Sequence, residues 1–224
     1  MNENLLSVII PAFNAEKYLE EAVNSVRRQR WIGEMEILLV DDGSADGTVA
    51  LAQKLGCKVM KKEHGGAAAA RNVGIRTSRG AWILLLDADD RLCNNALEAL
   101  YQPFEKSPET SAVFGRAEDF ISPELSLEQS SGLKMREGSY EGVLPGCSLI
   151  RRSTFDGIGL FDESLKSGET VDWMMRLRSS GMETVKIETT TLCRRLHLSN
   201  TGRVNPRQEM MNYANLLRKR MKKT

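Results

Sequence analysis

The sequence lacks the features that mark several large classes of protein. No apolar run approaches the roughly 20 residues that a bilayer-spanning helix needs, and the opening MNENLLSVII has no basic segment, so we expect no secretory signal. The 31 Lys and Arg balance the 30 Asp and Glu, so no overall charge attracts nucleic acid. The four cysteines (Cys57, Cys93, Cys147 and Cys193) lie far apart and include no CxxC pair. We expect them to be reduced thiols in a cytoplasmic protein, with neither a disulfide framework nor a zinc site.

Two common phosphate-binding motifs are also missing. No GxGxxG follows the first apolar run, and no GxxxxGK[ST] occurs anywhere. Both motifs place backbone amides around phosphate groups. Their absence argues against a dinucleotide-dependent dehydrogenase and against a P-loop enzyme.

The first half of the chain alternates short apolar runs with helical patterns. The apolar runs cover residues 6–10, 37–40, 58–60 and 82–86, and their continuity suits strands buried on both faces. Amphipathic stripes lie at 18–26, with Asn14 as a cap, and at 49–55, with Gly56 as the stop, and a third helix opens at 67–70. This alternation predicts an α/β fold, with an open, mostly parallel sheet covered by helices on both faces.

Polar clusters follow three of the four predicted strands. PAFN occupies 11–14, DDGS occupies 41–44 and DADD occupies 87–90. Ligands of open α/β sheets bind outside the carboxyl ends of the strands, so the three clusters should face one crevice. Beyond 115 we predict a long functional loop over 116–146, a helix near 170–180, a strand near 183–188 and a basic helix over 207–223.

The DADD cluster concentrates negative charge at the end of an apolar strand. Asp87 and Asp89 would point to the same side about 7 Å apart, and their repulsion would cost roughly 2–3 kcal/mol at an effective dielectric near 20. A divalent cation such as Mg²⁺ or Mn²⁺ would remove that cost. The alternative is that the acids cap the next helix, with Asp90 and Asn94 near its start. The position at a strand end favours the metal for the first pair and leaves Asp90 as a cap.

Two further segments have both a functional and a structural interpretation. In VDDGSADGT (40–48), Ser44 or Asp46 caps a helix, while one of the two preceding aspartates can accept hydrogen bonds from a nucleotide. In HGGAAAARNVG (64–74), two glycines at a helix start allow phosphate to approach the amides. The alternative for this second segment is a small-residue helix on the sheet, with Arg71 in a surface salt bridge.

Taken in order, these segments resemble the family 2 glycosyltransferases, which have the GT-A fold. The matching segments are SVIIPAFNAEKYLEEAVNSV, ILLVDDGSADGT, GGAAAARNVGI, GAWILLLDADDRL and IGLFDESL. The resemblance covers most of residues 5–190. It implies a GT-A domain over 1–205, with a nucleotide-sugar-binding half (1–115), an acceptor-side half (116–205) and a basic tail (206–224).

The resemblance also implies a reaction and a site. The chain would use Mg²⁺ or Mn²⁺ to transfer a sugar from a UDP- or dTDP-sugar, with inversion, in polysaccharide or glycoconjugate synthesis. Asp89 would bind the metal and Asp42 the nucleobase. The full set of residues implied to bind the nucleotide-sugar is Pro11, Phe13, Asn14, Asp42, Arg71, Asp87, Ala88 and Arg195.

The sequence departs from the family where the catalytic base is expected. Members commonly carry GEDxDW, whose aspartate deprotonates the acceptor, but this chain reads SGETVDW (167–173), with Thr170 in the aspartate's place. A threonine hydroxyl is no general base near neutral pH. Glu169 and Asp172 are equal candidates for that role. An alternative is a catalytically impaired nucleotide-binding protein, and a sugar nucleotidyltransferase is a weaker one.

The end of the chain adds basic residues. In LCRRLHLSN (192–200), Arg194 and Arg195 could hold a diphosphate, and His197, one of two histidines, could be a second metal ligand or a structural residue. The tail over 207–223 could rest on an anionic membrane, contact a second copy of the chain or be a solvated helix. We therefore expect a cytoplasmic or membrane-peripheral protein whose acceptor is a glycan, a lipid-linked sugar or a protein.

Overall fold

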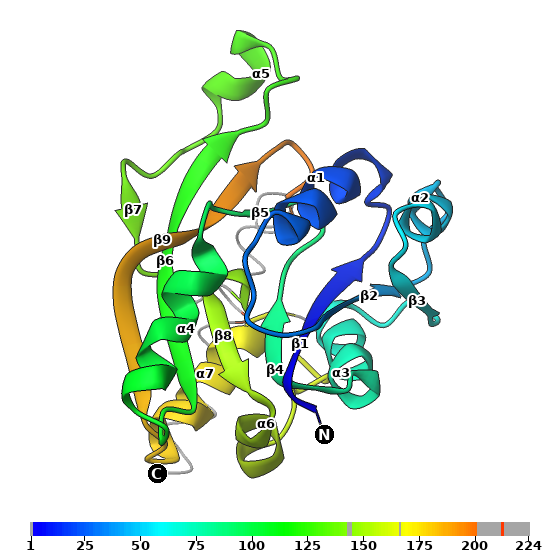
Figure 1. The fold of residues 1–224 in the computed structure, drawn as a ribbon. Helices are drawn as coiled ribbons and strands as arrows, with labels where there is room; N and C mark the ends of the chain where they lie inside the picture. The colour runs from blue at the N-terminus through cyan, green and yellow to red at the C-terminus, as the bar shows by residue number, and fades with distance from the viewer. Residues whose placement is uncertain (1, 143–144, 166, 201–211, 213–224) are drawn as a thin grey trace.

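The computed structural model describes residues 2–142, 145–165, 167–200 and 212 (Figure 1). Its strands are β1 (Asn2–Ala12), β2 (Met35–Asp41), β3 (Lys58–Lys61), β4 (Gly80–Leu85), β5 (Arg91–Leu92), β6 (Ala112–Ile121), β7 (Ser139–Tyr140), β8 (Ser148–Arg151) and β9 (Thr184–Leu196). Its helices are α1 (Glu16–Arg27), α2 (Thr48–Lys54), α3 (Ala67–Thr77), α4 (Ala96–Lys106), α5 (Leu127–Ser131), α6 (Arg152–Ile158) and α7 (Glu169–Ser179), with a 3₁₀ turn, η1 (Pro145–Cys147).

The strands of the described residues form one sheet in the order β3-β2-β1-β4-β8-β6-β9-β5, and β7 pairs with β6. β1 pairs in parallel with both β2 and β4, and β2 pairs in parallel with β3. β8 is antiparallel to β4 and to β6, whereas β6 and β9 are parallel. The predicted α/β fold with a mostly parallel sheet is therefore confirmed.

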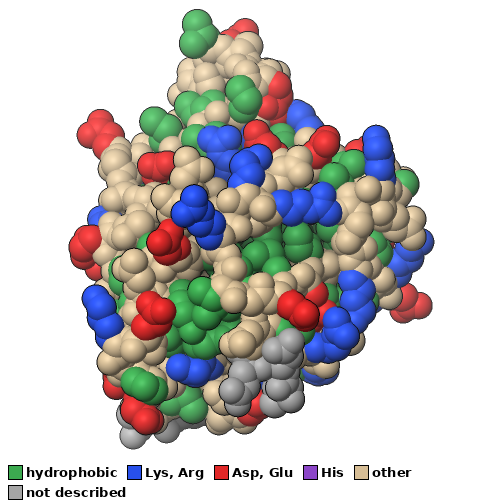
Figure 2. Space-filling model, in the orientation of Figure 1, with side chains coloured by type: hydrophobic (Ala, Val, Ile, Leu, Met, Phe, Trp, Pro, Cys, Tyr) green, Lys and Arg blue, Asp and Glu red, His purple; other side chains and the backbone are tan. Residues whose placement is uncertain are grey.

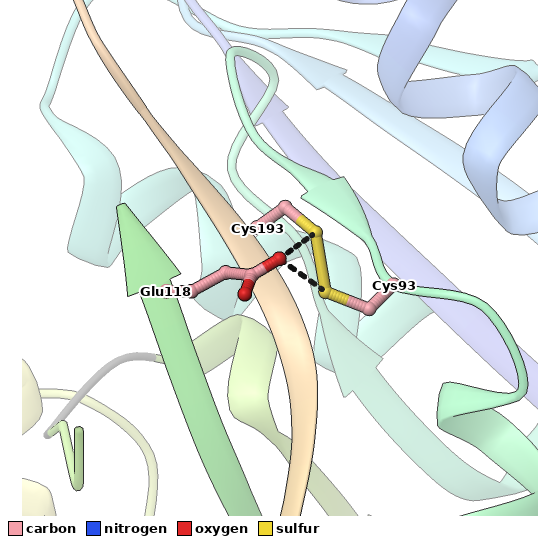
Figure 3. A group of neighbouring side chains, drawn as sticks. All are labelled: Cys93, Glu118 and Cys193. Carbon is pink, nitrogen blue, oxygen red and sulfur yellow. Dashed lines mark hydrogen bonds between the residues drawn. A yellow bond between two sulfur atoms is a disulfide. The ribbon is translucent and has the colours of Figure 1, made fainter. Parts of the chain in front are cut away.

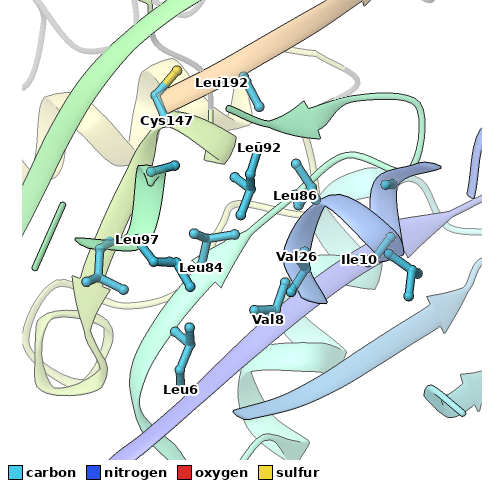
Figure 4. Close-up of a cluster of buried hydrophobic side chains, with 14 of the residues drawn as sticks. Leu6, Val8, Ile10, Val26, Leu84, Leu86, Leu92, Leu97, Cys147 and Leu192 are labelled. Atoms are coloured by element: carbon cyan, nitrogen blue, oxygen red, sulfur yellow. The ribbon is translucent and has the colours of Figure 1, made fainter. Parts of the chain in front are cut away.

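Helices cover both faces of the sheet because the strand side chains alternate between two cores. Leu6, Val8 and Ile10 of β1 face the core that α1 and α4 close (Figure 4). Ile9, between them, faces the second core, which includes Ile75 of α3. Burial on both faces is why these strands read as continuous apolar runs.

The predicted loop over 116–146 is only partly a loop. Residues 116–121 continue β6, and α5 and β7 follow within the same segment. These residues pair with β7 and β9, and their mixture of polar and apolar side chains contains no continuous apolar run that would predict a strand. The segment between β6 and β7 projects from the body of the molecule with α5 at its tip (Figure 1), where Leu127 is 91% exposed.

The later elements agree with their predicted types but differ in extent. α7 matches the helix predicted at 170–180, while the strand predicted at 183–188 extends to Leu196 as β9. The basic helix predicted over 207–223 lies outside the described residues, apart from Asn212. None of the helices that the structure describes has the length and apolar character needed to cross a membrane. Acidic and basic side chains are interspersed over the face shown in Figure 2.

Two of the predicted helix caps are wrong. α1 begins after Ala15, and the Asn14 side chain accepts instead from the amide of Ala45. α4 begins after Asn95, and β5 lies between Asp90 and this helix start, so Asp90 is no cap and accepts instead from the Arg195 amide. Asn94 directly precedes the N-cap residue Asn95, and no side chain caps the helix there. Gly56 does follow α2, with the positive φ of 64° that favours glycine.

The prediction of four reduced thiols is also wrong. Cys93 and Cys193 form a disulfide with Cα atoms 5.8 Å apart, although 100 residues separate them in the chain. The pairing of β5 with β9 brings the two together, and short-range spacing gives no signal of such a contact. Cys57 and Cys147 are free and buried.

Candidate functional site

The loops that follow β1 and β2 hold each other through side-chain-to-backbone hydrogen bonds. Three amides at the start of α1 donate to side chains of the second loop, and two amides of the second loop donate to side chains of the first. The bonds, with the donor first, are Asn14 N to Ser44 Oγ (2.9 Å), Ala15 N to Thr48 Oγ1 (2.8 Å), Glu16 N to Asp46 Oδ2 (3.2 Å), Ala45 N to Asn14 Oδ1 (2.9 Å) and Gly47 N to Glu16 Oε2 (2.9 Å). The first amides of α1 are thus satisfied from another loop, which no local cap pattern reveals.

Asp42, directly after β2, lies at the centre of a cluster of donors. Its carboxylate accepts from Lys62 Nζ at 2.5 Å and from the amides of Gly65 and Gly66 at 2.9 and 2.8 Å, and His64 Nδ1 lies 2.9 Å away. Burial alone would raise the pKa of Asp42, but the hydrogen bonds from Lys62 and the two amides lower it below its usual value. A carboxylate is thus fixed between the end of β2 and the start of α3.

An exposed aromatic edge lies beside this carboxylate. The rings of Phe13 and His64 are 4.4 Å apart between centroids, and Phe13 is 50% exposed. Pro11, two residues earlier in β1, is half-buried and pairs with Val40 of β2. The edge offers two exposed aromatic rings at the carboxyl end of the parallel strands, next to a fixed hydrogen-bond acceptor.

Arg71 of α3 connects two acidic residues that lie far apart in the sequence. Its Nη1 donates to Glu169 at 2.6 Å and its Nη2 donates to Asp87 at 2.8 Å. The Arg71 side chain is 6% exposed, against 35% for Asp87 and 16% for Glu169. Burial alone would lower the pKa of Arg71, and the two carboxylates raise it, so the guanidinium stays charged. It thereby sets the positions of both carboxylates.

Asp89 and His197 face each other across the next part of the site. Asp89 Oδ2 lies 2.9 Å from His197 Nε2, and His197 Nδ1 lies 2.9 Å from Ser199 Oγ. The His197 ring packs 4.9 Å from that of Tyr18. The Asp89 side chain keeps 32% exposure, whereas His197 keeps 8%. The pair therefore offers one accessible carboxylate and one nitrogen ligand that its neighbours orient.

Asp90 and Arg195 form contacts that connect the segments carrying Asp89 and His197. The Arg195 amide donates to Asp90 Oδ1 at 2.8 Å, and Arg195 Nε donates to the Asp89 carbonyl at 2.9 Å. The guanidinium lies between the rings of Tyr18 and Phe120, each 4.6 Å away, with its side chain 3% exposed. Burial, followed by the nearby charges of Asp89 and Asp87, raises the pKa of Asp90 well above its usual value. Arg195 thus contacts the backbone of the acidic loop from within the fold.

The start of α7 places its two acidic residues in different environments. Glu169 meets Arg71, whereas Asp172 is buried and accepts from Arg176 Nε at 2.9 Å. Thr170 faces a small apolar pocket that Trp173 also lines. Glu169 is therefore the acidic residue of this segment that lies next to the DADD loop.

The structure brings most of the predicted site residues together at one edge of the sheet. Arg71 contacts Asp87 and Glu169, and Asp89 contacts His197. Asp42, Phe13 and Asn14 belong to the neighbouring loops. Ala88 is buried in the core that α1 and α4 close. Lys62 and His64 were not predicted as partners of Asp42, although both lie just before the two glycines that open α3.

Comparisons with known proteins identify a family and a fold. The family described as "Glycosyl transferase family 2" matches residues 7–159. "Glycosyltransferase GlyG" of Streptococcus pneumoniae is 29% identical over 179 residues, which cover 69% of this chain and 59% of the relative. Across the first four curated relatives that it matches, the chain spans 41–60% of their lengths.

Solved structures share the fold. TarS 1–349 of S. aureus in complex with UDP superimposes with a TM-score of 0.68 at 23% identity, covering 85% of this chain and 60% of that one. The mannosyltransferase PcManGT of Pyrobaculum calidifontis, in complex with GDP-Man and Mn²⁺, gives a TM-score of 0.68 at 17% identity and covers 95% and 64%. At these identities the likeness concerns the fold alone.

Proposed function

The chain belongs to the family 2 glycosyl transferases, and we propose that it transfers a sugar from a UDP- or dTDP-sugar to an acceptor hydroxyl, with inversion at the anomeric carbon. The observation that carries the proposal is the Asp89–His197 pair, 2.9 Å apart, beside the Asp87–Arg71–Glu169 cluster. The complexes of related folds with UDP and with GDP-Man and Mn²⁺ support a nucleotide-sugar donor.

The donor set fits a divalent cation. Asp89 offers a hard, partly exposed oxygen, and His197 offers a nitrogen whose ring is held by Ser199 through the other nitrogen. A carboxylate with an imidazole suits Mn²⁺, and a carboxylate with water and phosphate oxygens suits Mg²⁺. Such a cation, when bound, neutralises the negative charge that develops on the diphosphate as the sugar leaves.

The protein's own residues position the two substrates. Phe13 and His64 offer a ring surface for the nucleobase, Pro11 and Asn14 belong to the same first loop, and Asp42 offers an acceptor for base hydrogens. Asp87, held by Arg71, contacts the ribose or the sugar. Arg195 supports the site indirectly, because its guanidinium holds the Asp89 carbonyl.

Glu169 is the general base of the proposed reaction. It takes the proton of the acceptor hydroxyl, whose oxygen attacks the anomeric carbon as the bond to the diphosphate breaks. Arg71 binds one oxygen of this carboxylate and fixes its direction. Asp172 anchors α7 through Arg176 instead, and Arg176 also donates to the carbonyls of Ile158 and Leu160. Because Glu169 can act as the base, the threonine at position 170, where family members commonly carry aspartate, is weak support for a catalytically impaired protein.

The acceptor half is 116–205, where the segment between β6 and β7 projects with α5 at its tip. We assign acceptor recognition to this half, for a glycan, a lipid-linked sugar or a protein. Contact of 207–223 with an anionic membrane or a second copy of the chain belongs to the same proposal, in a cytoplasmic or membrane-peripheral enzyme.

A thermal-shift screen of nucleotides tests the donor assignment. UDP and UDP-sugars should raise the melting temperature more with Mn²⁺ than with EDTA, because a ligand of the native state stabilises it by mass action. ATP and NAD serve as comparison ligands. An equal response to UDP with and without the metal would contradict the metal-assisted donor site.

Asp42 should contribute stability that depends on pH. The pKa of Asp42 is lowered in the folded state, so its contribution is full above the unfolded pKa near 3.8 and is lost as pH falls through the lower folded value. Asp42→Asn should lower the free energy of unfolding by about 1–3 kcal/mol at pH 7, because Lys62 loses its buried partner.

Urea unfolding of both proteins at pH 7 and at pH 3 measures this contribution. The difference in free energy of unfolding between wild type and Asp42→Asn should be smaller at pH 3 than at pH 7. An equal difference at both pH values would mean that the Asp42 charge is not what stabilises the loop.

A further inference from the structure

The disulfide joins two strands that meet only through long-range pairing. β5 runs antiparallel to β9, with Arg91 opposite Cys193 and Leu92 opposite Leu192. The Cys93 amide donates to the Thr191 carbonyl at 3.0 Å, which continues the ladder by one residue. Figure 3 shows the two cysteine side chains pointing toward each other between these strands.

The cross-link lies on the same pair of segments that supplies the proposed metal ligands. Asp89 precedes Cys93 by four residues, and His197 follows Cys193 by four. Between these two contacts, Arg195 donates from its amide to Asp90 and from its Nε to the Asp89 carbonyl. Residues 89–93 and 193–197 therefore run antiparallel, with the disulfide at one end of the paired segments and the Asp89–His197 contact at the other.

The sulfur atoms lie beside a solvent-facing carboxylate. Glu118 of β6 is exposed, and its Oε1 lies 3.4 Å from Cys193 Sγ and 3.9 Å from Cys93 Sγ. In the reduced protein this oxygen can accept an S–H hydrogen, and its negative charge disfavours the thiolate. Cys93 is only half-buried, so small thiols and disulfides can reach the pair.

We propose that Cys93 and Cys193 form a reversible disulfide site that holds Asp89 against His197 and thereby strengthens metal-dependent nucleotide binding. The effect on binding rests on the donor site proposed above. A small-molecule disulfide such as glutathione disulfide accepts two electrons from the two thiols, the Cys93–Cys193 bond forms, and two glutathione thiols leave with the two protons. A dithiol such as dithiothreitol reverses the reaction.

The test compares the wild-type chain after glutathione disulfide with the same chain after dithiothreitol, so that no substitution is needed. Peptide mapping should find the 93–193 cross-link only in the oxidised sample. Reduction should weaken the affinity for UDP in Mn²⁺ on the order of fivefold and lower the melting temperature by roughly 5–15 °C. It should also speed amide exchange over residues 87–93 and 193–198.

Two variants separate the effect of the Cys93–Cys193 disulfide from general effects of redox reagents. Cys93→Ser should bind UDP as the reduced wild type does and should not respond to either reagent. Cys57→Ala removes a free cysteine elsewhere, and it should respond as the wild type does. A response that survives Cys93→Ser would overturn the assignment.

The remaining outcomes also decide. Equal UDP affinity in the two redox states overturns the coupling and leaves the donor site intact. If UDP binds in neither state, the proposed function fails. Amide exchange over residues 87–93 and 193–198 then decides whether the disulfide holds these two segments together: faster exchange on reduction supports it, and unchanged exchange overturns it. If the reduced chain binds one zinc ion through Cys93, Cys193 and Glu118 and forms no disulfide, the proposed disulfide site is overturned and the three residues are a metal site.

Discussion

Replacing Glu169 by Gln is expected to lower turnover by roughly 10²–10⁴-fold, the range for loss of a general base. The Gln amide keeps the size of the side chain and its oxygen can still accept from Arg71, so the cluster with Asp87 should persist. Donor affinity should change little, because the lost function is proton transfer from the acceptor. Steady-state release of UDP, together with calorimetric UDP affinity, measures both effects.

Asp172→Asn is the matched comparison on the same helix. Asp172 is buried and paired with Arg176, so this change should destabilise the fold while turnover per folded molecule stays close to that of the wild type. The reverse pattern, with Asp172→Asn inactive and Glu169→Gln active, would transfer the role of base to Asp172. Full activity in both variants would remove the base from this segment.

Asp89→Ala should abolish the gain in UDP affinity that Mn²⁺ provides. The substitution removes the carboxylate that we propose as a metal ligand, together with its contact to His197. We therefore expect UDP affinity in Mn²⁺ to fall roughly 100-fold, to the level measured in EDTA. Calorimetric titrations of UDP with Mn²⁺ and with EDTA give the two values for each protein.

Asp156→Ala controls for the loss of an exposed carboxylate far from the site, since Asp156 lies on α6. It should leave the Mn²⁺ dependence unchanged. If Asp89→Ala kept the wild-type dependence, the metal would have to be held elsewhere, and Asp89 would have only its bond to His197.

The sequence predicted the strands that carry continuous apolar runs. β1, β2 and β4 are buried on both faces, and their continuous apolar runs follow from that burial. The end of β6 escaped prediction because residues 116–121 mix polar and apolar types and only Ala117 among them is fully buried, so no apolar run marks their pairing with β9. The mixture of polar and apolar residues there resembles a loop when the partner strand is unknown.

The site shows the same division between local and long-range information. The rule that ligands meet strand ends located Asp87 and Asp89, because it depends only on where each strand stops. The roles of Asp90 and Arg195 depend on a contact between segments more than 100 residues apart. The disulfide and the capping of α1 by the second loop belong to this class too.

The reciprocal bonds between the loops after β1 and β2 have a consequence for how the chain tolerates change. Each loop completes the hydrogen bonding of the other, so neither can lengthen or open by itself without exposing several unsatisfied amides. The five amides should therefore exchange with deuterium as one cooperative unit. An insertion in either loop should disturb the other across the sheet edge, and Phe13, although exposed, is thereby kept in place before any nucleotide arrives.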